Sequence, residues 1–135
     1  MRRISLLLLG TIVASCTTAP PPQEARSAQG EQELQQLLAG KVAQRPTTCL
    51  QSYQANDMRV IDPTTVAFRQ GSSRVYVAHM RAPCDLLDRA GYALVTREYG
   101  SAQLCNGDIA RVVNTGSRMT VGSCVFGDFT PYYRP

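Results

Sequence analysis

The sequence predicts a mainly β fold, a small antiparallel β-barrel or sandwich with one N-terminal helix, braced by two disulfides. Three observations support this prediction. From residue 49 onward, short runs of β-branched and aromatic residues alternate with turn-forming residues, as they do in all-β domains. One stretch, residues 31–43, carries the helical spacing of apolar residues. Four of the five cysteines fall after residue 48, an even number that suits two cross-links.

The first fifteen residues are predicted to be a signal peptide. A basic start, Met1-Arg2-Arg3, precedes an apolar run over residues 4–13, and residues 13–16 have the sequence VASC. The apolar run has about ten residues, too few for the roughly 20 that span a bilayer, but it fits a signal peptide. The segment resembles a bacterial lipoprotein signal with its lipobox. The resemblance implies that the Cys16 thiol receives a diacylglyceryl group and that cleavage leaves Cys16 as a fatty-acylated N-terminus.

The same segment allows one alternative to lipidation and suggests a cellular location. Ordinary secretory cleavage at the small-residue site would leave Cys16 unmodified. Because Thr17, and not an aspartate, follows the cysteine, the resemblance implies transfer to the outer membrane, facing the periplasm. Residues 16–30 are rich in proline and polar residues and lack apolar periodicity, so they are predicted to be a tether. Residues 31–135 are then long enough for a single folded domain.

The helix is predicted over residues 31–43. Its apolar residues form one stripe at positions i, i+3, i+4 and i+8, namely Leu34, Leu37, Leu38 and Val42. Glutamates in the first turn and Lys41 near the end complement the helix dipole. Pro46 prevents the helix from continuing. We expect the stripe to pack on the domain.

A β-domain is predicted over residues 49–129, because apolar runs recur there between turn signals. The runs predicted as strands are residues 58–61, 65–69, 74–80, 92–98, 108–113 and 118–126. Residues 114–117, with the sequence NTGS, suit a four-residue hairpin loop. Residues 82–91 are expected to form a turn that ends at a glycine. This regular spacing favours an antiparallel sheet that curls on itself.

The four cysteines of the domain are expected to form two disulfides, because an exported small domain folds in an oxidising compartment. Three pairings are possible, and we favour Cys84–Cys105 with Cys49–Cys124. The first would close a short loop of chain that contains the strand at residues 92–98, and the second would link the first segment of the domain to the last. A zinc site usually has close pairs such as C-x2-C, whereas these cysteines lie nineteen or more residues apart. No metal and no cofactor are therefore expected.

Charge argues against a nucleic-acid partner. The chain has 14 basic and 10 acidic residues, and removing Arg2 and Arg3 with the leader leaves 12 against 10, a net charge of +2. The basic residues are spread along the domain, whereas a nucleic-acid protein concentrates them in a patch with aromatic platforms.

Candidate functional residues are few. His79 is the only histidine, no G-x-S-x-G element is present, and no catalytic residue is predicted. The loop Cys105-Asn106-Gly107-Asp108 has two interpretations: a rigid loop that presents Asp108, or a disulfide-anchored hairpin turn. Tyr132 and Tyr133 could supply a binding surface, because tyrosine is favoured at interfaces, or they could pack at an edge or in the core.

Several short motifs together resemble a family of small, exported bacterial domains of unknown function. They are residues 49–50 (CL), 59–62 (RVID), 65–68 (TVAF), 74–77 (RVYV), 83–84 (PC), 104–108 (LCNGD) and 122–124 (GSC). The resemblance covers roughly residues 49–129. It implies that the four cysteines belong to one framework and that the protein is exported, and it brings no activity, substrate or catalytic residue.

The expected function is that of a lipid-anchored cell-envelope protein, a non-catalytic structural or binding module. It would meet the membrane through its lipid, and its partner would be an envelope protein or a cell-wall polymer. One alternative is an inhibitor or modulator of an envelope hydrolase such as lysozyme, which needs an exposed loop with a basic or serine-bearing tip. A second alternative is a small envelope enzyme, which needs convergent polar groups in a deep pocket.

Overall fold

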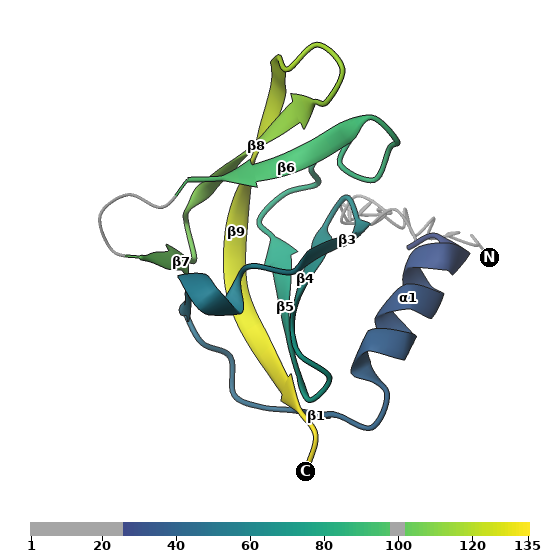
Figure 1. Cartoon of the computed structure of the whole chain (residues 1–135), viewed down its shortest axis with the longest axis vertical. Helices are drawn as coiled ribbons and strands as arrows, with labels where there is room; N and C mark the ends of the chain where they lie inside the picture. The colour runs from purple at the N-terminus through teal and green to yellow at the C-terminus, as the bar shows by residue number, and fades with distance from the viewer. Residues whose placement is uncertain (1–25, 98–101) are drawn as a thin grey trace, which may run out of the picture.

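A curled antiparallel sheet forms most of the computed structural model, which describes residues 26–97 and 102–135 (Figure 1). The order of its strands is β3-β4-β5-β9-β8-β6, and β1 pairs with the C-terminal end of β9. A second sheet contains β2 and β7. The strands are β1 Val42–Ala43, β2 Cys49–Gln51, β3 Met58–Asp62, β4 Thr65–Gln70, β5 Arg74–Met80, β6 Tyr92–Thr96, β7 Gln103–Cys105, β8 Ile109–Asn114 and β9 Thr120–Tyr133. The predicted fold class is confirmed: mainly β, half-barrel in shape, with one helix and two disulfides.

The long strand β9 organises the sheet, as the yellow arrow through the centre of Figure 1 shows. Its N-terminal half pairs with β8, and its C-terminal half pairs with β5. The predicted strand stopped at Phe126, but β9 continues to Tyr133 and includes Pro131. Pro131 lacks an N–H, and its carbonyl accepts a hydrogen bond from the Gln44 amide at 2.8 Å. The C-terminal end of β9 therefore accommodates the proline within the ladder.

The helix α1 is Ala28–Leu38, so it begins and ends earlier than predicted. Ser27 is its N-cap, and the Ser27 hydroxyl accepts a hydrogen bond from the Gly30 amide at 3.1 Å. The helix stops before Gly40, whose φ of +67° lies in the left-handed region that glycine favours. Val42, expected on the helical stripe, instead belongs to β1 and is 56% exposed. Residues 26–30, expected in the tether, belong to the folded domain.

Two apolar layers stabilise the domain. The inner face of the half-barrel holds the larger cluster, which includes Phe68, Phe126 and Phe129 with ring centroids 5.9–6.1 Å apart. The outer face of β3, β4 and β5 packs against Leu34 of α1, as Figure 1 shows for the helix and these strands. Strands β4 and β5 are therefore buried on both faces, which explains their nearly continuous apolar runs.

Gly30 permits the close approach of α1 to the sheet. A side chain at this position would collide with the backbone carbonyl oxygen of Ile61 in β3. The helix lies close enough for Arg26, just ahead of it, to reach the turn between β3 and β4. The Arg26 Nε donates to Asp62 Oδ2 at 2.6 Å, and the Arg26 guanidinium also donates to the Thr65 hydroxyl at 3.2 Å.

The disulfide pairing differs from the one that we favoured. The bonds are Cys49–Cys105 and Cys84–Cys124, not Cys84–Cys105 and Cys49–Cys124. Cys49 and Cys105 lie directly opposite each other in the β2–β7 ladder, a strand pair that the sequence did not predict. Cys84 follows β5 and meets Cys124 on β9, because the antiparallel register of these strands brings the two regions together.

Candidate functional site

A groove of about 400 Å³ opens beside the C-terminal end of β9. The irregular segment that links β1 to β2 forms one wall, and β5 and β9 form the other. Its lining residues are Gln44, Arg45, Thr47, Cys49, Leu50, Gln54, Tyr76, Pro131 and Tyr133. Volumes of 300–1,000 Å³ are typical of small-molecule sites, as are mixed aromatic and polar linings. The groove is therefore the candidate ligand-binding site of the domain.

Tyr76 forms the base of the groove, because only 2% of its surface is exposed. Its hydroxyl accepts a hydrogen bond from Gln54 Nε2 at 2.7 Å and donates to Gln70 Oε1 at 3.4 Å. Burial, followed by its hydrogen bond with Tyr133, raises the pKa of Tyr76 to about 12. The phenol therefore stays protonated at any physiological pH and holds the base of the groove together.

Tyr133 forms the rim. Its ring meets the Tyr76 ring edge to face, with centroids 6.1 Å apart and an interplanar angle of 82°. The Cζ atom of Arg74 lies 5.3 Å from the Tyr133 ring centroid, a cation–π contact that orients the guanidinium. Gln44 and Arg45 line the opposite wall and are exposed. The rim thus presents an aromatic ring, an amide and guanidinium groups.

The structure separates the two tyrosines that the sequence singled out. Tyr133 lines the groove, whereas Tyr132 packs with Leu37 and Leu38 against the apolar layer beneath α1. The separation follows from the strand geometry, because successive side chains of β9 point to opposite faces of the sheet. Tyr133 is therefore available to a ligand, and Tyr132 supports the packing of the helix.

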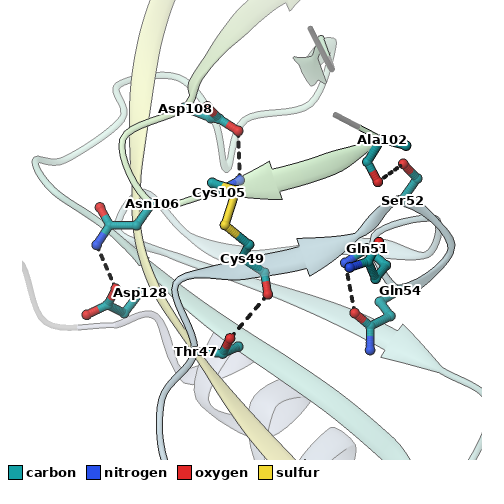
Figure 2. Close-up of a disulfide and its surroundings, with 10 residues drawn as sticks. All are labelled: Thr47, Cys49, Gln51, Ser52, Gln54, Ala102, Cys105, Asn106, Asp108 and Asp128. Atoms are coloured by element: carbon teal, nitrogen blue, oxygen red, sulfur yellow. Dashed lines mark hydrogen bonds between the residues drawn. A yellow bond between two sulfur atoms is a disulfide. The ribbon is translucent and has the colours of Figure 1, made fainter. Parts of the chain in front are cut away.

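Asp108 belongs to a turn beside the Cys49–Cys105 disulfide and does not line the groove (Figure 2). The Cys105 amide donates to Asp108 Oδ2 at 2.7 Å. Next to it, Asn106 Nδ2 donates to Asp128 Oδ1 at 2.6 Å. The Asp108 carboxylate is thus used within the loop, which favours the interpretation of a disulfide-anchored hairpin turn.

Most residues of the groove are not indicated by any sequence pattern. Gln44, Arg45 and Thr47 come from a segment without apolar periodicity, and Gln54 belongs to the short 3-10 helix η1, Ser52–Gln54. Their proximity to Tyr133 depends on the pairing of β1 with β9, which joins residues about 90 positions apart. The predicted lipidation residue Cys16 lies outside the described residues.

Residues 26–97 and 102–135 contain no cluster of histidine, cysteine and carboxylate side chains that could hold a metal ion. Within those same ranges, no helix has the length and apolar character needed to cross a membrane. Compared with known proteins, the chain matches no protein-family model, no curated protein and no solved structure.

Proposed function

We propose that this protein is a lipid-anchored module of the bacterial cell envelope that binds a cell-wall polymer in the groove beside Tyr133. The observation that carries the proposal is the concave lining, in which the rings of Tyr76 and Tyr133 lie among amide and hydroxyl side chains. A tyrosine ring offers apolar surface together with a polar tip. A sugar unit of a polymer, with apolar ring faces and hydroxyl edges, complements this combination.

Binding without catalysis fits the lining better than hydrolysis does. Glycoside hydrolysis needs a pair of carboxyl groups, and general acid–base catalysis most often uses histidine. The residues that line the groove include neither a carboxylate nor an imidazole. Its one cysteine, Cys49, is held in a disulfide. We therefore assign the groove a binding role.

The proposed localisation in the cell envelope depends on lipidation of Cys16 and is supported by the disulfides, which suit an oxidising compartment. Arg26, the first residue that the structure describes, already binds Asp62 of the sheet, so the proposed link to the lipid comprises residues 16–25. Ten residues extend to at most about 33–36 Å, which would keep the groove close to the membrane that carries the anchor. A wall polymer that lies beside that membrane would be within reach.

Replacement of Cys16 by serine is expected to move the protein from the membrane fraction to the soluble fraction. Acyl chains bind the bilayer by about 0.8 kcal/mol per buried methylene, and the serine hydroxyl does not receive them in this pathway. Mass spectrometry of the native protein should show cleavage before Cys16 and an added diacylglyceryl mass. Retention of the leader, or an unmodified Cys16 thiol, would contradict the proposed anchor.

Replacement of Tyr133 by alanine is expected to weaken binding to purified peptidoglycan by about tenfold, as the loss of an aromatic contact worth more than 1 kcal/mol predicts. The measurement is co-sedimentation of the detergent-solubilised protein with cell-wall sacculi. Tyr53→Ala is the matched control, because Tyr53 is 64% exposed and does not line the groove. Thermal unfolding of both variants would confirm that they remain folded. Equal binding by the wild-type protein and Tyr133→Ala would contradict the assignment of the groove as the binding site.

One observation favours inhibition of an envelope hydrolase as a second candidate. The hairpin between β8 and β9 presents Ser117 and Arg118 at an exposed tip. The Asn114 side-chain carbonyl accepts hydrogen bonds from the amides of Gly116 and Ser117 at 3.0 and 2.9 Å, which fixes the loop. Inhibition of lysozyme that is lost in Arg118→Ala and kept in Tyr133→Ala would favour this candidate over polymer binding.

A further inference from the structure

We infer that the groove recognises an oxyanion on its ligand, a carboxylate or a phosphate, and that Arg45 and Arg74 are the receptor for this group. The inference rests on the proposed function and names the chemistry that the groove selects. Arg45 lines the groove, and Arg74 lies against the Tyr133 rim. Arg45 thus belongs to the lining of the groove, and Arg74 lies beside the aromatic ring that forms its rim.

The distribution of charge around the groove is one-sided. Arg45 is the one charged residue among the described residues that line the groove, and the chain segments that contain its lining residues, residues 42–54, 70–80 and 129–134, hold three arginines and no aspartate or glutamate. The carboxylates of the described residues lie elsewhere, at Glu31, Glu33, Asp57, Asp62, Asp85, Asp88, Asp108 and Asp128. A site lined by one sign of charge raises the local concentration of ligands with the opposite sign.

Arg45 and Arg74 are among the described arginines that form no ion pair within the domain. Arg26, Arg59 and Arg69 are each bound to a carboxylate. In the part of the chain that the structure describes, neither Arg45 nor Arg74 forms such an ion pair. Their hydrogen-bond donors are therefore not committed to a carboxylate of the domain.

The geometry of Arg74 suits recognition of a planar or tetrahedral oxyanion. Its cation–π contact with Tyr133 restrains the guanidinium beside the rim, where its N–H groups have no carboxylate partner among the described residues. Guanidinium groups bind carboxylates and phosphates through two parallel hydrogen bonds, which a neutral sugar cannot match. The ligand class that fits is therefore a sugar polymer with carboxylate or phosphate substituents, with its sugar ring on Tyr133 and its oxyanion between the arginines.

Three soluble oligomers of equal length test this inference with the detergent-solubilised protein. One is neutral (N-acetylglucosamine oligomers), one bears carboxylates (peptidoglycan fragments with peptide stems), and one bears phosphates. Calorimetry should give a dissociation constant about tenfold lower for at least one anionic oligomer than for the neutral one, as one charge-assisted contact predicts. This preference should shrink between 50 and 200 mM salt, because exposed charges are screened over about 10 Å at 0.1 M.

Arg45→Gln with Arg74→Gln should remove the anionic preference, so that the three oligomers bind with dissociation constants within about twofold of one another. Arg111→Gln with Arg118→Gln is the matched control, because it removes the same charge away from the groove and should leave the preference unchanged. Arg45→Gln alone provides a second measurement, since Arg45 is exposed and supports no packing. The oligomer that binds more tightly identifies carboxylate or phosphate as the source of the oxyanion.

The outcomes separate this inference from the proposed function. Equal affinity for all three oligomers, unaffected by the arginine variants, would overturn the oxyanion receptor and leave polymer binding in place. Absence of binding by every oligomer and by sacculi would overturn both. A loss of preference in the Arg111 and Arg118 control that equals the loss in the groove variant would also overturn the inference, because it would show an effect of net charge alone.

Discussion

Replacing Cys84 and Cys124 together with alanine is expected to lower the free energy of unfolding by about 4–6 kcal/mol. The bond joins residues 40 positions apart, and closing a loop of that length contributes about 4 kcal/mol in the chain-entropy account. Both cysteines are also part of the main core, at 2% and 5% exposure, so their loss leaves a gap in the packing. Guanidinium denaturation monitored by circular dichroism measures the change.

The matched control is Cys49→Ala with Cys105→Ala. Its loop is longer, 56 positions, but these cysteines are half-buried in the two-stranded sheet and stay outside the main core. We expect a loss of about 4 kcal/mol, close to the entropic contribution alone. A larger loss for this pair than for Cys84 and Cys124 would contradict the assigned packing. A proteolytic fragment that joins Cys84 to Cys105 would contradict the connectivity itself.

Replacing Arg26 with alanine is expected to lower the free energy of unfolding at pH 7 by about 2–3 kcal/mol. The Asp62 side chain is only 7% exposed, so the variant leaves a buried carboxylate without its cationic partner. Such losses reach about 3–5 kcal/mol for fully buried pairs, and the 26% exposure of the Arg26 side chain reduces the expected value. Arg59→Ala is the control, because its ion pair with Asp57 is exposed and should change stability by less than about 1 kcal/mol.

The effect of Arg26→Ala should depend on pH. Burial raises the pKa of Asp62, but hydrogen bonds from Arg26, Thr64 and Thr65 outweigh it and lower the pKa below 3.8. The ionised Asp62 therefore stabilises the wild-type fold fully above the unfolded pKa, and this contribution is lost as the pH falls through the lower folded pKa. Without Arg26, the hydrogen bonds from Thr64 and Thr65 remain, but burial is opposed less strongly and the pKa of Asp62 rises, so the variant should lose less stability on acidification. A difference between the two proteins that stays constant from pH 7 to pH 2.5 would contradict this account.

Local sequence patterns were sufficient to predict the hairpins of the sheet. The strands β3, β4 and β5 lie close to the predicted runs, because the turns between them are marked by Asp62-Pro63 and by residues 70–73. The strands β1, β2 and β7 were missed because they are two or three residues long. Such strands have too few positions for alternation to appear, and their partners are remote in sequence.

Because local patterns do not indicate which distant strands pair, neither the disulfide pairing nor the groove was predicted. Choosing Cys105 as the partner of Cys49 requires knowledge of the β2–β7 pair, which no local pattern indicates. Tyr133 was singled out by residue type, whereas Gln44 and Arg45 are recognisable only once β1 lies beside the end of β9. Long-range strand pairing, and not local propensity, therefore decides which residues form the site.

The bond between Arg26 and Asp62 has a mechanical consequence. Tension on the chain ahead of Arg26 is transmitted to the turn between β3 and β4, through the hydrogen bonds from Arg26 to Asp62 and Thr65. The load thus enters the sheet before it can unwind α1 from its first turn. If one end of the domain were held by a bilayer and the other by a rigid wall, the contacts of Arg26 would resist relative movement of the bilayer and the wall.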